Sequence, residues 1–415
     1  MNRVSSNMAR IDAQYHMMMR EWKLNDMENK MAMQSRIKNL RDDPMAASHS
    51  TRYQSKLVRL ARYNRNIDDV KAGLSMAESK LNDSVQRIQR IRELAVQGAN
   101  GVYTKEDMAA MGQEVDQLLE EIVDLGNSRN GLGNTLFGGF ESKVEPFRIL
   151  RGKVDGGNRN HIVEVQYRGD IGRNVAEVSE ESVAEMNIPG NYAFWAENQS
   201  VYSTIDARAY QVQANTTISV DGVDIPLREG DNIYAVISRI NDSPAAVKAS
   251  LDPVRDSLVL QTTTPHQLWL EDGTGGTVLQ DLGVIRPGGT GIPANNYALS
   301  ANVYGGSVFD VVMSLRDSLF KGDADGVNRA LGGLDQSVES LTSHLAEIGS
   351  VTERLDGTGQ RLAFEIPLIT ENNSKEVDLD LAEAITNLKM LDATHQAALA
   401  TAARILQPTL LDFLR

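Results

Sequence analysis

One stretch of this chain has a series of positions at alternating intervals of three and four residues, without interruption, and nearly all of them are apolar. They are Tyr53, Lys56, Leu60, Tyr63, Ile67, Val70, Leu74, Ala77, Leu81, Ser84, Ile88, Ile91 and Ala95, of which only Lys56 and Ser84 are clearly polar. A 3.5-residue period held for about six heptads predicts one long helix whose apolar seam faces another helix. At about 1.5 Å per residue this helix would span roughly 64 Å. A rod of that length favours a structural, self-associating protein over an enzyme.

Amphipathic helices are predicted at both ends of the chain, over residues 4–38 and from about 378 to 407. The first is rich in methionine, whose flexible side chain makes an adaptable packing surface. A break separates it from the long helix, where Asp43 is expected to cap and Pro44 to take the first helical position.

The middle helices repeat the same alternation. The long helix should end near residues 98–101, and Thr104 with Asp107 then forms a capping box for a helix that closes at Gly126. A short loop between the two would make them antiparallel.

A further helix is predicted over 308–319, and after a pause at 321–326 three more heptads follow over 327–348. The phase continues to Leu355 and Leu362. However, Gly357, Gly359 and Pro367 predict that this helix breaks beyond about residue 356.

Helical periods vanish between about 144 and 301. Two short strands flank an Asp221-Gly222 turn, Asp231 is expected to cap a short helix, and two more strands follow at 247–251 and 257–261. The order predicts a β-β-α-β-β unit within a mostly-β insert.

The predicted fold class is therefore α+β: a long antiparallel coiled-coil-like helical bundle formed by both termini, with an inserted mostly-β domain. Three domains are expected. Terminal helices comprise 1–43 and 375–415, long-helix segments comprise 44–143 and 302–374, and the insert comprises 144–301.

Composition narrows the function classes. The chain has 415 residues, no cysteine and a net charge of −14, which excludes thiolate chemistry and argues against a nucleic-acid partner. The chain contains no run of 18 apolar residues, so the sequence predicts no membrane-spanning segment. Its first residues lack the apolar region of a Sec-type signal.

Candidate catalytic and metal motifs are weak. None of the six histidines lies in an H-E-x-x-H motif or close enough in sequence to another for a local zinc site. The glycine-rich stretches 98–101 and 272–277 lack the Gly-Lys-Ser/Thr of a phosphate loop, and 321–326 lacks the distal Glu of a calcium loop. We expect no enzymatic activity, no cofactor and no metal.

Several blocks of sequence, in the right order, resemble the flagellin-like axial proteins of bacterial flagella over about 1–140 and 305–415. They are RVSSNM at 3–8, Arg41-Asp-Asp-Pro-Met-Ala-Ala47, Arg65-Asn-Ile-Asp-Asp69, Ile91-Arg-Glu-Leu-Ala-Val-Gln-Gly-Ala-Asn-Gly101, Gln113-Glu-Val-Asp-Gln-Leu-Leu119, Phe137-Gly-Gly139, Asp380-Leu-Ala-Glu-Ala-Ile-Thr386 and Ala402-Ala-Arg-Ile-Leu-Gln-Pro408 with its LLDFLR ending. Within the family, Asp-Asp-Pro and Phe-Gly-Gly resemble the hook-associated members at the hook–filament junction. Flagellins usually have Asp-Asp-Ala-Ala-Gly at the first place.

The resemblance implies a structural subunit that joins hook to filament, with paired terminal helices lining the channel of a helical or ring assembly and the insert projecting outward. It implies export through the flagellar type III apparatus without a cleaved signal, to an extracellular or periplasmic flagellum. The implied partners are other copies of itself, an adjacent hook-associated protein, flagellin on the filament side, and an export chaperone at the C-terminal helix. The terminal helices would be flexible or disordered in the monomer and fold on assembly.

Apolar positions on both terminal helices are the expected subunit interface: Val4, Met8, Ile11, Met18, Trp22, Leu381, Ile385, Leu388, Leu391, Leu399, Ile405, Leu406, Leu411 and Leu414. Asp42, Asp43 and Pro44 are the expected hinge. Two alternatives stay open. A filament flagellin would polymerise without limit, and a cytoplasmic coiled-coil adaptor would never leave the cell.

Overall fold

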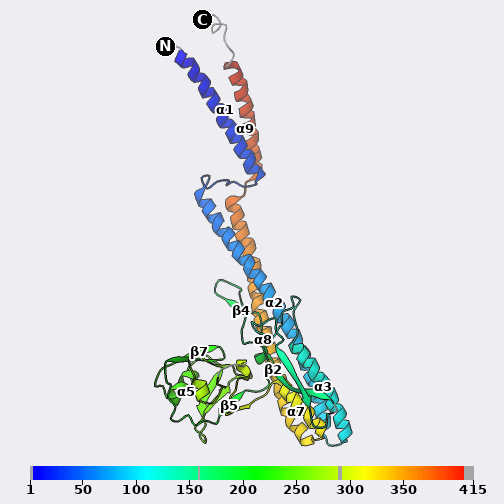
Figure 1. The fold of residues 1–415 in the computed structure, drawn as a ribbon. Helices are drawn as coiled ribbons and strands as arrows, with labels where there is room; N and C mark the ends of the chain where they lie inside the picture. Colours follow the sequence, from blue (N-terminus) through cyan, green and yellow to red (C-terminus); the bar gives the residue numbers. More distant parts are fainter. Residues whose placement is uncertain (1–2, 158, 288–291, 406–415) are drawn as a thin grey trace. The chain divides into compact units, whose positions relative to one another are not determined.

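The computed structural model describes residues 3–157, 159–287 and 292–405. The chain divides into two compact units, one formed by Met1–Asn64 with Gly359–Arg415 and the other by Arg65–Thr358. We call them the terminal unit and the central unit. The α+β fold class predicted from the sequence is confirmed, because long helices flank a region of short strands (Figure 1).

Long helices dominate both halves of the chain. The helices are α1 (Arg3–Ala32), α2 (Pro44–Ala99), α3 (Lys105–Gly126), α4 (Gly190–Ala193), α5 (Ile233–Asn241), α6 (Val278–Asp281), α7 (Val308–Lys321), α8 (Ala324–Val377) and α9 (Leu381–Ile405), with a 3-10 turn at Pro293–Asn295. The long predicted helix is α2, and every seam position from Leu60 to Ala95 is buried. The 3.5-residue period therefore identified the packed face of α2.

Antiparallel pairing of α2 with α8 is visible in the ion pairs of the central unit. Arg92 lies 2.6 Å from Asp335, and Lys71 pairs with Asp356. The two pairs are 21 residues apart on each helix, so the helices run in opposite directions in one register. On the other side of α2, Arg87 lies 2.6 Å from Glu121 of α3.

Two of the predicted helix starts are confirmed by their caps. Thr104 and Asp107 form the capping box of α3, and Asp43 accepts the N–H of Ala46 at 3.0 Å at the start of α2. Gly322, with φ of 71°, ends α7 in the left-handed conformation that glycine adopts readily.

The predicted break beyond residue 356 is wrong, because α8 continues to Val377 with Pro367 inside it. The reason is tertiary packing. Leu355, Leu362 and Ile369, seven residues apart, are all buried, so the seam continues on both sides of the proline. Burial along that seam outweighs the loss of one backbone hydrogen bond.

The first helix is shorter than predicted, since α1 ends at Ala32 rather than at residue 38. Gln34 has φ of 51°, and the backbone beyond it bonds to the segment between α8 and α9. This pairing of two distant segments replaces the last turns of the predicted helix.

The strands form four small antiparallel sheets. They are β1 (Phe147–Lys153) with β2 (Asn160–Tyr167); β3 (Val175–Glu177) with β4 (Val183–Glu185); β6 (Thr216–Val220), β7 (Val223–Leu227) and β10 (Leu270–Asp272) in the order β10-β6-β7; and β5 (Ser200–Ser203), β8 (Val247–Leu251), β9 (Leu258–Thr262) and β11 (Ala301–Tyr304) in the order β11-β5-β9-β8. The predicted β-β-α-β-β unit is confirmed by β6, β7, α5, β8 and β9. Its hairpin turns at Asp221 and Gly222, with φ of 50° and 75°.

One predicted cap in this region is wrong. Asn232, not Asp231, accepts the N–H of Ala235 at 2.9 Å and caps α5. Asp231 instead accepts the N–H of Arg228 and pairs with Arg239. The two residues are neighbours, and both types cap helices well, so the sequence does not separate them.

A buried ion network joins three elements of the central unit. Helices α3 and α7 lie side by side (Figure 1), and the fully buried Arg316 of α7 donates to Asp116 of α3 at 2.7 Å. Asp116 also lies 2.8 Å from the imidazole of His161 on β2, and Asp317 accepts from the other side of the guanidinium. Removing one partner would leave a buried charge undercompensated.

We therefore predict that Asp116→Ala lowers the free energy of unfolding by about 3 kcal/mol, because Arg316 keeps only Asp317 as a counter-ion. Urea denaturation would measure the change. The control is Arg87→Ala, which removes a half-exposed ion pair and should cost less than about 1 kcal/mol. Equal effects of the two substitutions would show that the network does not stabilise the central unit.

Candidate assembly surface

Helices α1 and α9 pair in the terminal unit, lying side by side in opposite directions (Figure 1). Small side chains line the α9 side of the contact, where Ala384 and Ala402 are buried. From α1, the guanidinium of Arg20 crosses to α9 and donates to the carbonyl of Thr394 at 3.0 Å. Alanine lets the two backbones approach, but it contributes little apolar area to the contact.

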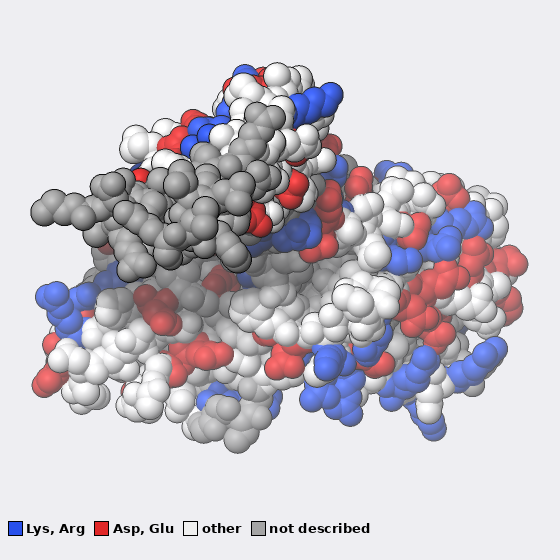
Figure 2. Space-filling view, turned by 90° about the horizontal axis from the view of Figure 1, so that it is seen from above, with Lys and Arg blue, Asp and Glu red and all other residues white. Residues whose placement is uncertain are grey.

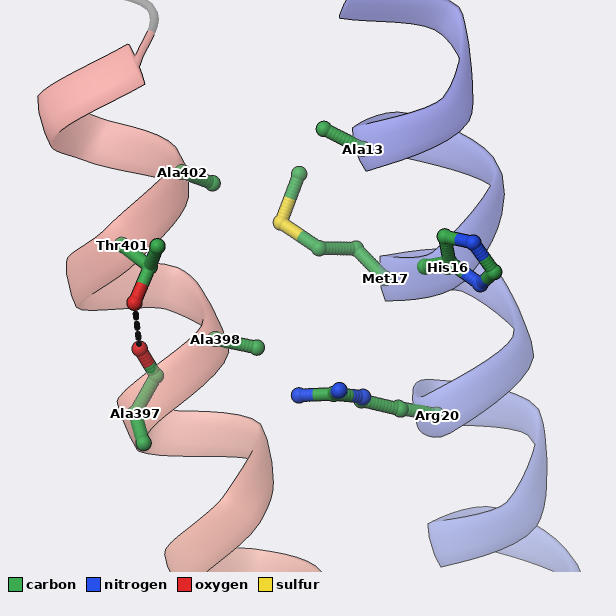
Figure 3. A pocket seen from close by; sticks show the side chains of 8 residues that line it. All are labelled: Ala13, His16, Met17, Arg20, Ala397, Ala398, Thr401 and Ala402. Atoms are coloured by element: carbon green, nitrogen blue, oxygen red, sulfur yellow. Dashed lines mark hydrogen bonds between the residues drawn. The ribbon is translucent and has the colours of Figure 1, made fainter. Parts of the chain in front are cut away.

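A cavity of about 260 Å³ lies between the two helices (Figure 3). Met17 and Arg20 point into it from α1, and Ala398 and Ala402 lie opposite on α9. This cavity opens to solvent, so the contact between α1 and α9 leaves a groove on the surface of the pair.

The outer face of α1 carries a continuous apolar stripe. Its positions are three and four residues apart, and 54–68% of each side chain is exposed: Met8, Ile11, Tyr15, Met18 and Trp22. We call these five residues the α1 stripe. A helix with an apolar stripe on the face away from its own partner helix has a second surface for packing.

The candidate interface residues predicted from sequence separate into groups. Met8, Ile11, Met18 and Trp22 lie together on the α1 stripe, and Leu381, Ile385 and Leu399 are exposed on α9. Leu388 and Leu391 are half-buried, and they follow the heptad spacing of Ala384, Ala398 and Ala402 toward α1. The side chains of Val4 and Ile405, and residues Leu406, Leu411 and Leu414 entirely, lie outside the described part of the chain.

Among the exposed apolar residues of the terminal unit that sequence reasoning missed are three on α8 and α9. Met390 lies on α9, and Phe364 and Leu368 lie on α8, away from its seam. In the sequence, these three residues could be noticed only as apolar residues that lie between the heptad positions of their helices.

The break before α2 and the break after α8 lie at the same end of the antiparallel α2–α8 pair and are joined to each other. Arg36 donates its N–H to the carbonyl of Val377 at 2.7 Å, Leu379 donates to Gln34 at 3.2 Å, and Ser35 forms a bridge with Asp378. The linker before α2 and the linker before α9 therefore form one hydrogen-bonded joint.

The predicted hinge residues form a capped turn next to this joint. Asp42 accepts the N–H groups of Lys38 and Asn39 at 3.0 and 3.1 Å. Hydrogen bonds from Asn39 and Lys38 lower the pKa of Asp42 below its usual 3.8, and the N–H of Ala46 lowers that of Asp43. Pro44 is the first residue of α2.

The rest of the described chain offers little chemistry. Within residues 3–157, 159–287 and 292–405, no three His, Cys, Asp or Glu side chains are arranged to hold a metal ion. His161 and His266 each bond a carboxylate, of Asp116 and Asp221. Figure 2 shows basic and acidic side chains interspersed over the face that it draws.

No helix among the described residues is long and apolar enough to cross a membrane.

Three family models match the chain. Residues 4–142 match the bacterial flagellin N-terminal helical region, residues 331–414 match the bacterial flagellin C-terminal helical region, and residues 212–264 match the flagellin hook IN motif. The first two contain every residue of the candidate assembly surface on α1 and α9, together with the hinge candidates.

Individual relatives are distant. Flagellin E of Vibrio cholerae is 23% identical over 99% of this chain and 98% of its own length. Flagellar hook-associated protein 3 of Escherichia coli is 28% identical over 31% of this chain and 40% of its own length. The crystal structure of flagellar hook-associated protein 3 from Legionella pneumophila is similar over 78% of this chain and 97% of its own, with 15% identity and a TM-score of 0.47.

The capped turn should open in acid. Because the pKa values of Asp42 and Asp43 are lowered in the folded chain, their contribution is present above 3.8 and is lost as pH falls through the lower folded values. We predict that the amide resonances of Lys38, Asn39 and Ala46 titrate with midpoints below 3.8 in an NMR pH series.

The matched control is Asp43→Asn, since asparagine also caps helices but does not titrate in this range. Ala46 should then keep its hydrogen bond throughout, while Lys38 and Asn39 titrate as before. Midpoints at or above 3.8 would contradict the assignment of these hydrogen bonds.

Proposed function

Because the chain belongs to the flagellin-like family of bacterial flagellar structural proteins, we propose that it is the subunit that joins hook to filament. It assembles with other copies of itself through the paired helices α1 and α9. Its role is mechanical, and it carries out no catalysis.

The observation that supports assembly most directly is the exposed α1 stripe. The α1 stripe alone leaves five large apolar side chains in water, although α1 already has a partner helix in α9. Packing against neighbouring copies removes this surface from water, at roughly 25 cal/mol per Å² of apolar area. The alanine-lined cavity gives the same helices room for side chains of another copy.

The choice of a junction subunit rests on two short motifs. Asp42-Asp43-Pro44 and Phe137-Gly-Gly139 resemble the hook-associated members of the family more than filament flagellins. In the chain, Asp43 caps α2, and the buried Phe137 has a carbonyl that accepts from the hydroxyl of Tyr167 at 3.0 Å. Both motifs thus have defined structural roles here.

Filament flagellin is the second candidate. The similarity to Flagellin E over 99% of this chain favours it, because that match includes the whole insert. A cytoplasmic coiled-coil adaptor does not agree with membership of a flagellar family.

The finer features follow as parts of the proposal. The three expected domains, with boundaries at 43/44, 143/144, 301/302 and 374/375, correspond to an inner channel lining, a surrounding shell and an outward insert. Asp42, Asp43 and Pro44 act as the joint between the first two. The chain leaves the cell by the flagellar export route without a cleaved signal, an export chaperone binds α9, and the assembled neighbours are another hook-associated protein and flagellin.

Electron microscopy of the purified chain added to isolated hooks would test the role. The hooks must lack filaments and carry any hook-associated protein that precedes this one. We expect a short collar that stops growing even when the chain is in excess. Long filaments would instead identify a flagellin and contradict the reading of the two motifs.

A further inference from the structure

A second apolar patch lies in the terminal unit, on the outer face of α8. Phe364 is 82% exposed and Leu368 is 57% exposed, one helical turn apart, with exposed Pro367 between them. All 54 residues of α8 are described, and no other large apolar side chain of this helix is exposed to solvent. The three residues are called the α8 patch below.

The patch is unrelated to the seam that joins α8 to α2. Leu362 and Ile369 belong to the seam and are buried, whereas Phe364 and Leu368 fall between seam positions. Lys56 of α2 lies 2.6 Å from Glu365, so α2 contacts the residue next to Phe364. Phe364 itself remains exposed to solvent. The α2–α8 pairing therefore does not explain why these positions are apolar.

Proline gives the patch a polar group as well. Pro367 has no N–H, so the carbonyl of Ala363 lacks the donor four residues further on, and Ala363 is exposed. A surface that combines an aromatic ring, a leucine and a carbonyl without its usual helical donor fits a partner with apolar side chains and one hydrogen-bond donor.

We propose that the α8 patch binds the α1 stripe of a second copy of this chain. The stripe has the complementary chemistry: it is apolar at every position, and its Trp22 and Tyr15 carry an indole N–H and a hydroxyl that can donate to the Ala363 carbonyl. The inference rests on the proposed function, because it names the counter-surface that the self-assembling α1 stripe contacts.

A second copy fits better than a charged or extended partner. A stripe of five residues at heptad spacing from Met8 to Trp22 is helical and about 21 Å long, so it presents large side chains to a helix surface. When the α1 stripe of one copy packs on the α8 patch of another, both apolar surfaces are removed from water. The assembly surface thereby extends from the terminal helices onto α8.

Substitution with a charge tests the contact. Phe364→Glu should reduce incorporation into collars on hooks about tenfold or more, because a carboxylate would be buried in place of the ring. The matched control is Val254→Glu, which puts the same charge at an exposed valine of the central unit and should assemble as the unchanged chain does. Equal helix content by circular dichroism verifies that both variants fold.

Cross-linking tests the partner, and the absence of cysteine from the natural sequence makes it clean. Met18→Cys and Leu368→Cys are made as separate single variants and mixed, so that any cross-link joins two copies. A short bismaleimide should link them in assembled collars but not in dilute monomers. Met18→Cys mixed with Val254→Cys is the control and should give no such product.

Each outcome decides between the claims. If the unchanged chain forms no collar, the proposed function fails and this inference fails with it. If the unchanged chain assembles and Phe364→Glu assembles equally well, only the α8 patch inference is overturned. Normal assembly in vitro combined with failed export from cells would also overturn it, by assigning the patch to an export partner.

Discussion

The antiparallel pairing of α2 with α8 is the interaction on which the rest of the structure depends. A single apolar seam on α2, buried from Leu60 to Ala95, fixes which faces of the long helices are covered. Within the terminal unit, the same pairing places Lys56 beside Glu365 and His49 beside Glu376. The linker before α2 therefore meets the linker after α8, and their backbones bond where Leu379 donates to Gln34. Pairing of α1 with α9 is the consequence.

Much of the helical part could be predicted, because its signals are local. The seam of α2 repeats without interruption, and the Thr104–Asp107 box marks a helix start through two side-chain contacts three residues apart. The fold class followed from the change of pattern near residues 144 and 301. Predictions that depended on distant contacts failed. Pro367 is tolerated because buried Leu362 and Ile369 hold α8 on both sides of it, and α1 ends early because residues 34–36 bond to a segment more than 300 positions away.

The assembly surface was only partly predictable for a related reason. Most heptad positions on α1 and α9 are apolar, so the sequence identifies the stripes but does not assign each to an inner or an outer face. The structure separates them, with Leu388 and Leu391 turned toward α1 and Trp22 and Met18 exposed. Phe364 and Leu368 lay outside every repeat, and no periodic argument selects such residues.

The central claim is that other copies of the chain cover the α1 stripe, and the three tryptophans allow a direct test. Trp195 and Trp269 are buried, whereas Trp22 is exposed on the stripe. Acrylamide quenching of fluorescence should therefore reach Trp22 in the free chain, and this quenched component should disappear when the chain assembles on hooks. The variant Trp22→Phe identifies the component. If Trp22 is quenched as readily in the assembly as in the free chain, the stripe is not an interface between copies and the account is contradicted.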